Sequence, residues 1–341
     1  MFRSRRASLV QRLWRLRCVT PGPDETHGGL KPAAHALFKK LKDKELELLL
    51  QAVESQGGAA AAAGESGCLW VEARGVKAGP SASLLLCRLY RWPDLRQPHE
   101  LKRLCLCKSA GGEAGGVHCC NPHHLSRLAL PDTPPPPYCK ISPFSTPLKC
   151  TNVLENNCKG WQDTTLSRCS LRDGYWCKLA YWEYRLRVGR LYPVHGDYVC
   201  VFSNLPNGNG LCLGQLSSQN RSPAVRRTQA KIGRGLLLSQ EASGVWACNR
   251  SEHPLFVCSP TLGTGGSSAP PVHKILPGYS IKVFDYDRAT HLAGRCPVTS
   301  EGPHDGHTIR ISFGKGWGAS YTRRFITSCP CWLEVLLNAP R

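Results

Sequence analysis

Residues 105–124, CLCKSAGGEAGGVHCCNPHH, constrain the fold more than any other part of the chain, because they hold four cysteines and three histidines within twenty residues. Eleven residues, four of them glycine, separate Cys107 from Cys119. Such a density of soft ligands is typical of a metal site, of disulfides or of a catalytic thiol. The composition of the whole chain helps to decide among these three possibilities.

The cysteine usage argues against a disulfide framework. The 341-residue chain has 19 cysteines, an odd number, and no apolar signal segment. We therefore expect a reducing compartment and mostly free, buried thiols. The length predicts two domains, and since no run of about eighteen apolar residues occurs, we expect no membrane insertion.

The strongly basic balance predicts an anionic partner. The formal net charge is +20, and it is spread over the chain rather than confined to one tail. Nucleic acid, a phosphoprotein or a membrane surface would each complement such a charge.

The first half of the chain divides into an arm and a compact domain. Residues 1–18 carry six arginines and no acid, which is typical of a transit peptide, of a nuclear-import or nucleic-acid arm, or of a disordered solvated terminus; we expect residues 1–30 to be a basic disordered arm. Apolar spacing predicts one helix over residues 36–55. Residues 81–95 begin as a buried strand, and residues 99–107 have a helical pattern.

The second half of the chain differs from the first in composition and in hydrophobic pattern. A region rich in Pro, Ser, Thr and Asn predicts a linker over residues 131–175. Beyond it, short β-type runs separated by Asn-Gly and Gly-rich turns predict a β-sandwich. The expected fold is therefore α+β: residues 31–130 form a small amino-terminal domain, and residues 176–341 form a carboxy-terminal β-sandwich with flanking helices and loops.

Cys107, Cys119 and His124, together with one cysteine further upstream, have the composition of a closed tetrahedral zinc site. A catalytic zinc would need an open position and a fixed carboxylate, whereas Glu113 lies in a Gly-rich loop. Reduced buried thiols and a Cys/His hydrolase are the alternatives. Cys105 and Cys120 leave the ligand choice ambiguous, because each neighbours another candidate.

Several long motifs of the chain resemble those of a known protein family. CRLYRWPDLRQPHELKRLC and CCNPHHLSRL are similar to the amino-terminal homology domain of the Smad proteins, and YWEYRLRVGRLYPV, GLCLGQL, GVWACNRSEHPLFV, PGYSIKVFDYDR and SFGKGWGASYTRRFITSCPCWLEVLL resemble their carboxy-terminal domain. The resemblance implies one structural zinc ion that staples the amino-terminal domain. The ligands that it implies are Cys68, Cys107, Cys119 and His124.

Two departures from the signal-transducing Smads point to the inhibitory branch of the family. The chain ends CWLEVLLNAPR, without the Ser-Ser-x-Ser tail that receptors phosphorylate, so we expect no activation by tail phosphorylation. The stretch that matches the family's DNA-reading hairpin, residues 71–86, has Glu, Ala and Gly at expected contact positions, which argues against reading of base edges. Arg74 and Lys77 leave weak phosphate binding open.

A third feature is the sequence PPPPY at residues 134–138. Four prolines preform a polyproline II helix, which serves as a stiff spacer or, with the terminal tyrosine, as a ligand of a WW domain. The resemblance to Smads favours recruitment of HECT-type ubiquitin ligases. The residues expected to bind the WW domain are Pro135, Pro136 and Tyr138.

Two windows of the second domain, residues 198–240 and 306–333, carry basic residues and no acid. A solvated basic face is one interpretation; a phosphate-binding surface is the other, because Arg forks onto phosphate oxygens and Lys supplies a point charge. In Smads the matching region binds phosphorylated type I receptors or a partner's phosphoserine tail. We expect four residues to converge on one groove: Arg227, Lys231, Lys315 and Arg323.

The resemblance implies a non-enzymatic antagonist of TGF-beta/BMP signalling in cytoplasm and nucleus, which competes for activated type I receptors or the co-Smad. Its expected partners are phosphorylated type I receptors, other Smads, WW-domain HECT ubiquitin ligases and transcriptional corepressors. A zinc-containing, DNA-binding nuclear corepressor is the alternative. Salt-dependent DNA affinity of residues 1–133 separates the two.

Overall fold

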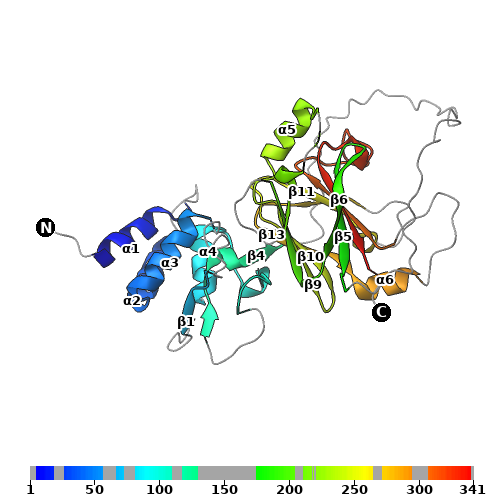
Figure 1. Ribbon diagram of the computed structural model, residues 1–341. Helices are drawn as coiled ribbons and strands as arrows, with labels where there is room; N and C mark the ends of the chain where they lie inside the picture. The colour runs from blue at the N-terminus through cyan, green and yellow to red at the C-terminus, as the bar shows by residue number, and fades with distance from the viewer. Residues whose placement is uncertain are drawn as a thin grey trace, which may run out of the picture.

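The computed structural model describes residues 5–18, 27–56, 67–72, 81–109, 117–129, 174–203, 210–216, 218, 220–263, 271–293 and 306–338. Figure 1 shows a helical domain, in blue and cyan, beside a β-sandwich coloured from green to red. Within these described ranges, no helix is both long and apolar enough to cross a membrane. The architecture confirms the predicted α+β fold class.

The amino-terminal domain is built around buried leucines contributed by all its helices. Phe38, Leu49 and Leu86 lie at its centre, each almost without exposed surface. The helices are α1 (Arg5–Arg15), α2 (His27–Lys40), α3 (Asp43–Glu54) and α4 (Ala82–Tyr90).

Helix α1 lies where the sequence predicted a disordered arm, and that prediction is wrong for residues 5–15. Leu9 and Leu13 are buried in the core of the domain, one face of α1 packing on α3. On its exposed face, Arg5 forms an ion pair with Glu47 of α3 at 2.5 Å. Burial of two leucines therefore orders a segment that its charge alone would leave solvated.

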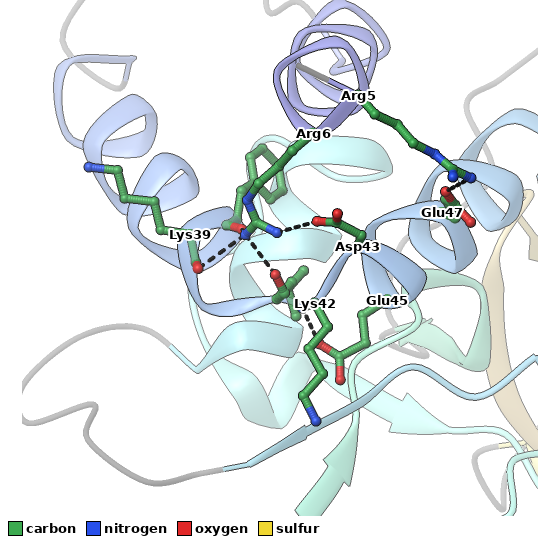
Figure 2. Close-up of polar contacts among 9 residues, drawn as sticks. Arg5, Arg6, Lys39, Lys42, Asp43, Glu45 and Glu47 are labelled. Carbon is green, nitrogen blue, oxygen red and sulfur yellow. Dashed lines mark hydrogen bonds and ion pairs between the residues drawn. The ribbon is translucent and has the colours of Figure 1, made fainter.

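The single helix predicted over residues 36–55 is two helices, because Arg6 of α1 occupies the break between them (Figure 2). Its Nη2 donates hydrogen bonds to the carbonyl oxygens of Phe38, Lys39 and Leu41, at 2.8, 3.1 and 2.7 Å. Its Nη1 pairs with Asp43 at 2.5 Å, at the first residue of α3. One guanidinium thus satisfies carbonyl groups at the end of α2 that have no intrahelical donor.

Residues 82–90 form helix α4, not the predicted strand. The Ser81 hydroxyl caps this helix by accepting a hydrogen bond from the Leu84 N–H at 3.3 Å. Leu86 and Leu89 pack into the helical core, while Leu84 and Cys87 pack into a second apolar cluster. A helix buried on two faces is apolar all round, so its sequence lacks the period that identifies a surface helix.

Short strands complete this domain, and residues 99–107 are not the helix that the sequence predicted. Strand β2 pairs antiparallel with β4 (Leu101↔Arg127), and β1 pairs with β3. Pairing with a strand more than twenty residues away overrides the local helical pattern. The elements are β1 (Trp70–Glu72), η1 (Pro98–Glu100), β2 (Leu101–Arg103), β3 (Val117–Cys119), η2 (Pro122–His124) and β4 (Leu125–Leu128).

The carboxy-terminal domain is the predicted β-sandwich. Tyr181, Leu238, Phe284 and Ile311 are buried between its two sheets. One sheet has the order β12-β11-β14-β15-β5-β6, and the other contains β13-β10-β9-β7-β8. Its elements are β5 (Cys177–Glu183), β6 (Leu186–Val194), β7 (Tyr198–Phe202), β8 (Gly210–Cys212), η3 (Leu213–Gln215), α5 (Pro223–Ala230), β9 (Leu236–Glu241), β10 (Gly244–Asn249), β11 (Leu255–Cys258), η4 (Pro260–Leu262), β12 (His273–Ile275), β13 (Tyr279–Asp285), α6 (Tyr286–Ala293), β14 (Thr308–Phe313), η5 (Ile326–Ser328) and β15 (Trp332–Leu337).

One sheet continues across both domains, because β4 pairs in parallel with β13. The buried Ser280 hydroxyl donates to the Ser126 hydroxyl at 2.7 Å, across this pair of strands. Beside it, Lys102 of β2 forms an ion pair with Glu241 of β9 at 2.7 Å. The domains are therefore docked through backbone pairing as well as through side chains.

Candidate functional site

Four buried donor side chains converge in the amino-terminal domain: Cys68, Cys107, Cys119 and His124. Cys119 ends β3, which pairs with β1 just beyond Cys68, and His124 ends the 3-10 turn η2. Cys107 lies in the turn after β2, where its N–H donates to the Leu104 carbonyl at 3.0 Å. Three separate segments thus deliver the donors that the family resemblance implied.

The spacing of the donor atoms fits a tetrahedral metal ion. The Sγ atoms of Cys68 and Cys107 are 3.8 Å apart, and Nδ1 of His124 lies 3.6 Å from Sγ of Cys68 and 3.4 Å from Sγ of Cys119. Zinc–sulfur bonds of about 2.3 Å in a tetrahedron place sulfurs roughly 3.8 Å apart. All four donor atoms lie within 4.8 Å of one another, so the cluster can hold a metal ion.

The electrostatics of the cluster favour a thiolate. A hydrogen bond from the Cys119 thiol lowers the pKa of Cys107, and Arg103 acts in the same direction through Nη1, which lies 3.8 Å from the Cys107 sulfur. The same Nη1 donates to the Cys119 carbonyl at 3.0 Å. Sequence reasoning missed Arg103; its place four residues before a ligand cysteine was the available signal.

The two ambiguous cysteines lie outside the cluster. Cys120 packs among the leucines of the helical core, and burial raises its pKa to about 11. Cys105 packs against Leu237 and Cys248 of the second domain, and burial raises its pKa to about 12. Neutral thiols in apolar surroundings are structural rather than metal-binding.

The second candidate surface lies on the sandwich, and helix α5 supplies part of it. Pro at its first position and the Ser222 hydroxyl, which accepts from the Val225 N–H at 3.3 Å, start this helix. Val225 faces the core, while Arg227 is exposed. Lys231, also exposed, caps the carboxyl end of the helix, four residues beyond Arg227.

Residues 314–325, the loop between β14 and η5, supply the other part. The Gly318 N–H donates to the Arg323 carbonyl at 2.8 Å, and the buried side chain of Trp317 anchors the loop in an apolar cluster, so the course of the loop is fixed. Lys315 and Arg323 both lie near the Cys329 thiol and oppose the rise of its pKa that burial causes. Both cations of this loop therefore lie within electrostatic range of one buried thiol.

Helix α5 and this loop lie at the same end of the sandwich (Figure 1). The thiol of Cys331, two residues beyond Cys329, lies 3.7 Å from the Val225 carbonyl of α5. No contact is described between Arg227 or Lys231 and Lys315 or Arg323, so their convergence on one groove stays a prediction. Among the described residues, none of the four forms an ion pair.

Other cations of the two acid-free windows have partners from distant segments. Arg221 forms an ion pair with the buried Glu183 at 2.8 Å, and Arg310 pairs with Glu334 at 3.7 Å. Arg234 donates to the carbonyls of Ser55 and Gln56 in the first domain. In the folded structure, acidic residues from outside these two windows therefore neutralise some of the basic residues within them.

Two predicted sites lie outside the described residues. These are the WW-binding motif with Pro135, Pro136 and Tyr138, and the part of the DNA-reading stretch with Arg74 and Lys77.

Comparison with known proteins gives consistent matches along the chain. The MH1 domain family matches residues 30–129 and the MH2 domain family matches residues 174–338. The chain is 48% identical over 331 residues to mothers against decapentaplegic homolog 6 of Gallus gallus, covering 92% of this chain and 76% of that protein. It is 44% identical over 341 residues to homolog 7 of Homo sapiens, covering 91% and 78%.

An MH1 domain followed by an MH2 domain defines a Smad-type signalling protein. The chain belongs to the inhibitory Smad family, as its motifs predicted.

Proposed function

We propose that this protein antagonises TGF-beta/BMP signalling by occupying activated type I receptors or a co-Smad in place of the signal-transducing Smads, and by recruiting HECT ubiquitin ligases to the receptor. It does so by binding, without catalysis, in cytoplasm and nucleus. One structural zinc ion held by Cys68, Cys107, Cys119 and His124 supports the first domain.

The observation that carries this proposal is the pair of cations on the fixed loop. Lys315 and Arg323 are partly exposed and have no carboxylate partner among the described residues. Two cations on one loop, with no carboxylate paired to either, make this surface attractive to an anion. A phosphate group accepts the bidentate fork of Arg and the point charge of Lys.

The surroundings of the loop fit a protein partner. Phe325 lies two residues after Arg323 and is 69% exposed. Its backbone carbonyl accepts a hydrogen bond from the Ser328 N–H at 3.0 Å. An exposed ring beside unpaired cations suits a phosphorylated segment with apolar neighbours, because the ring adds contact area to the charge attraction. Arg227 and Lys231 on α5 extend the basic surface.

Binding of the full chain to a type I receptor kinase domain, phosphorylated and dephosphorylated, tests the proposal. We expect the phosphorylated domain to bind more tightly, with an affinity that falls as salt is raised. The double variant Lys315→Glu/Arg323→Glu should lose at least ten-fold in affinity, with little change in melting temperature, since exposed charges contribute little to stability.

Arg187→Glu/Arg190→Glu is the matched control, because it also reverses two charges and both arginines are exposed on β6 and form no ion pair among the described residues. Receptor binding that survives reversal of Lys315 and Arg323, or that is indifferent to phosphorylation, would contradict the proposal.

A further inference from the structure

A cavity of about 510 Å³ lies between the two domains. The first domain contributes Trp92 and Leu104 to its wall, and the second contributes Cys248 and Pro277. This volume lies within the range of small-molecule sites, roughly 300 to 1,000 Å³, and the apolar wall can cover the carbon body of a ligand. The cavity is separate from both the metal cluster and the loop that carries Lys315.

Three arginines line this cavity: Arg91 from the first domain, and Arg234 and Arg250 from the second. All three are partly buried. Burial lowers the pKa of Arg91 and of Arg234, and the positive charge of Arg250 acts in the same direction on both. Arg250 therefore lies close enough to both Arg91 and Arg234 to repel them.

Neutral groups, rather than carboxylates, hold these arginines in place. Arg91 donates from Nη1 to the carbonyls of Pro122 and Leu125, and its guanidinium lies 4.0 Å from the centroid of the Trp92 ring. Arg234 donates to two carbonyls at the end of α3. The one described hydrogen bond of the Arg250 side chain is Nη1 to the sulfur of Cys200 at 3.5 Å.

The carboxylates of the cavity wall do not form ion pairs with these arginines. Glu54 forms an ion pair with Arg12 at 2.6 Å, and the exposed Glu252 lies near Arg234, where its charge opposes the fall of the Arg234 pKa without an ion pair between the two. Within the described part of the chain, no carboxylate lies within ion-pairing distance of Arg91, Arg234 or Arg250. Three partly buried cations with no paired carboxylate, and with only one exposed carboxylate nearby, are costly unless an anion binds between them.

We propose that this cavity binds a small anion carrying two phosphate groups, held by Arg91 of the first domain and by Arg234 and Arg250 of the second. Guanidinium groups recognise phosphate oxygens through paired N–H donors, which a monatomic anion such as chloride cannot exploit. Because the ligand contacts both domains, its binding stabilises their docked arrangement.

Calorimetric titration of the full chain with inorganic pyrophosphate tests this site. We expect Arg250→Gln to weaken binding at least ten-fold, while Arg187→Gln, which removes one exposed positive charge from β6, binds as the wild type does. Arg250 is the informative position because its described contact is weak, whereas Arg91 and Arg234 also hold backbone groups of the first domain. Equal affinity in all three proteins, or no binding to the wild type, would overturn the proposal.

Three further measurements distinguish an anion site in this cavity from a purely structural Arg250 and from binding at another surface. In the absence of anion, we expect Arg250→Gln to have a melting temperature no lower than that of the wild type, since the substitution relieves repulsion. A lower melting temperature together with wild-type affinity would make Arg250 a structural residue only.

Affinity that falls with Lys315→Gln and not with Arg250→Gln would place the anion on the loop. A phosphoserine peptide that binds more tightly than pyrophosphate, through Arg250, would make the ligand a protein segment and not a small molecule.

Discussion

Cys107 is the ligand residue whose loss is most informative. Cys107→Ser removes one of four convergent donors, and the binding free energy of a structural zinc, on the order of 10 kcal/mol, is comparable to the whole stability of a domain. We expect zinc at one equivalent per chain in the wild type, and loss of both the metal and the folded first domain in the variant.

Elemental analysis together with circular dichroism checks this result. Cys105→Ser is the control, because Cys105 lies two residues away and outside the cluster, packed against the second domain. A folded wild-type protein without metal would contradict the assignment.

Tyr138 is the residue on which ligase recruitment depends. In a Pro-Pro-x-Tyr ligand the tyrosine ring fills the groove, while the prolines preorganise the approach. We expect Tyr138→Ala to abolish binding to an isolated WW domain in calorimetry and to leave the melting temperature of the chain unchanged. Equal affinities for variant and wild type would reduce the motif to a spacer.

Among elements, α1 shows how a distant contact decides local structure. Leu13 has no exposed surface, whereas Leu16, one turn on, is 40% exposed. We expect Leu13→Ala to destabilise the first domain by about 2–5 kcal/mol, the usual cost of truncating a buried leucine. Leu16→Ala should change stability by less than about 0.5 kcal/mol. The urea midpoint of the first unfolding transition measures both, and equal midpoints would mean that α1 does not belong to the core.

The sequence predicted those elements whose pattern is local. The strands of the sandwich are short runs rich in apolar residues that end at turn residues, so the β-sandwich could be predicted from runs that include β7 and β13. Helix α4 and strand β2 were misread because burial on two faces and long-range pairing, respectively, decide their structures. Arg6 ends α2 from more than thirty residues away, which no local pattern records.

The candidate sites also divide into those that a local sequence pattern predicts and those that depend on contacts between distant segments. Cys107, Cys119 and His124 stand close together in the sequence, so their role could be inferred from residue type and spacing, while Cys68 needed the family resemblance. The cavity arginines could not be predicted, because Arg91 and Arg250 are brought together by the docking of two domains.

At the scale of the whole molecule, docking depends on the close approach of Gly278 to the first domain. A Cβ at this position would lie 2.5 Å from Nη2 of Arg91 and 3.1 Å from Cζ2 of Trp92. Arg91 cannot move aside cheaply, because the carbonyls of Pro122 and Leu125 hold its guanidinium. Even a methyl group at residue 278 should therefore push the two domains apart.

The backbone at Gly278 also has a φ of +83°, so any side chain strains it, and a control must carry the same strain. Gly174 has a φ of +64° and nothing within 4 Å of its would-be Cβ. We expect Gly278→Ala to increase the radius of gyration of the full chain in small-angle X-ray scattering, and Gly174→Ala to leave it at the wild-type value. Strain alone would affect both variants alike, whereas a steric block between the domains affects only the first. Identical scattering from the two variants would mean that the domains do not dock through this contact in solution.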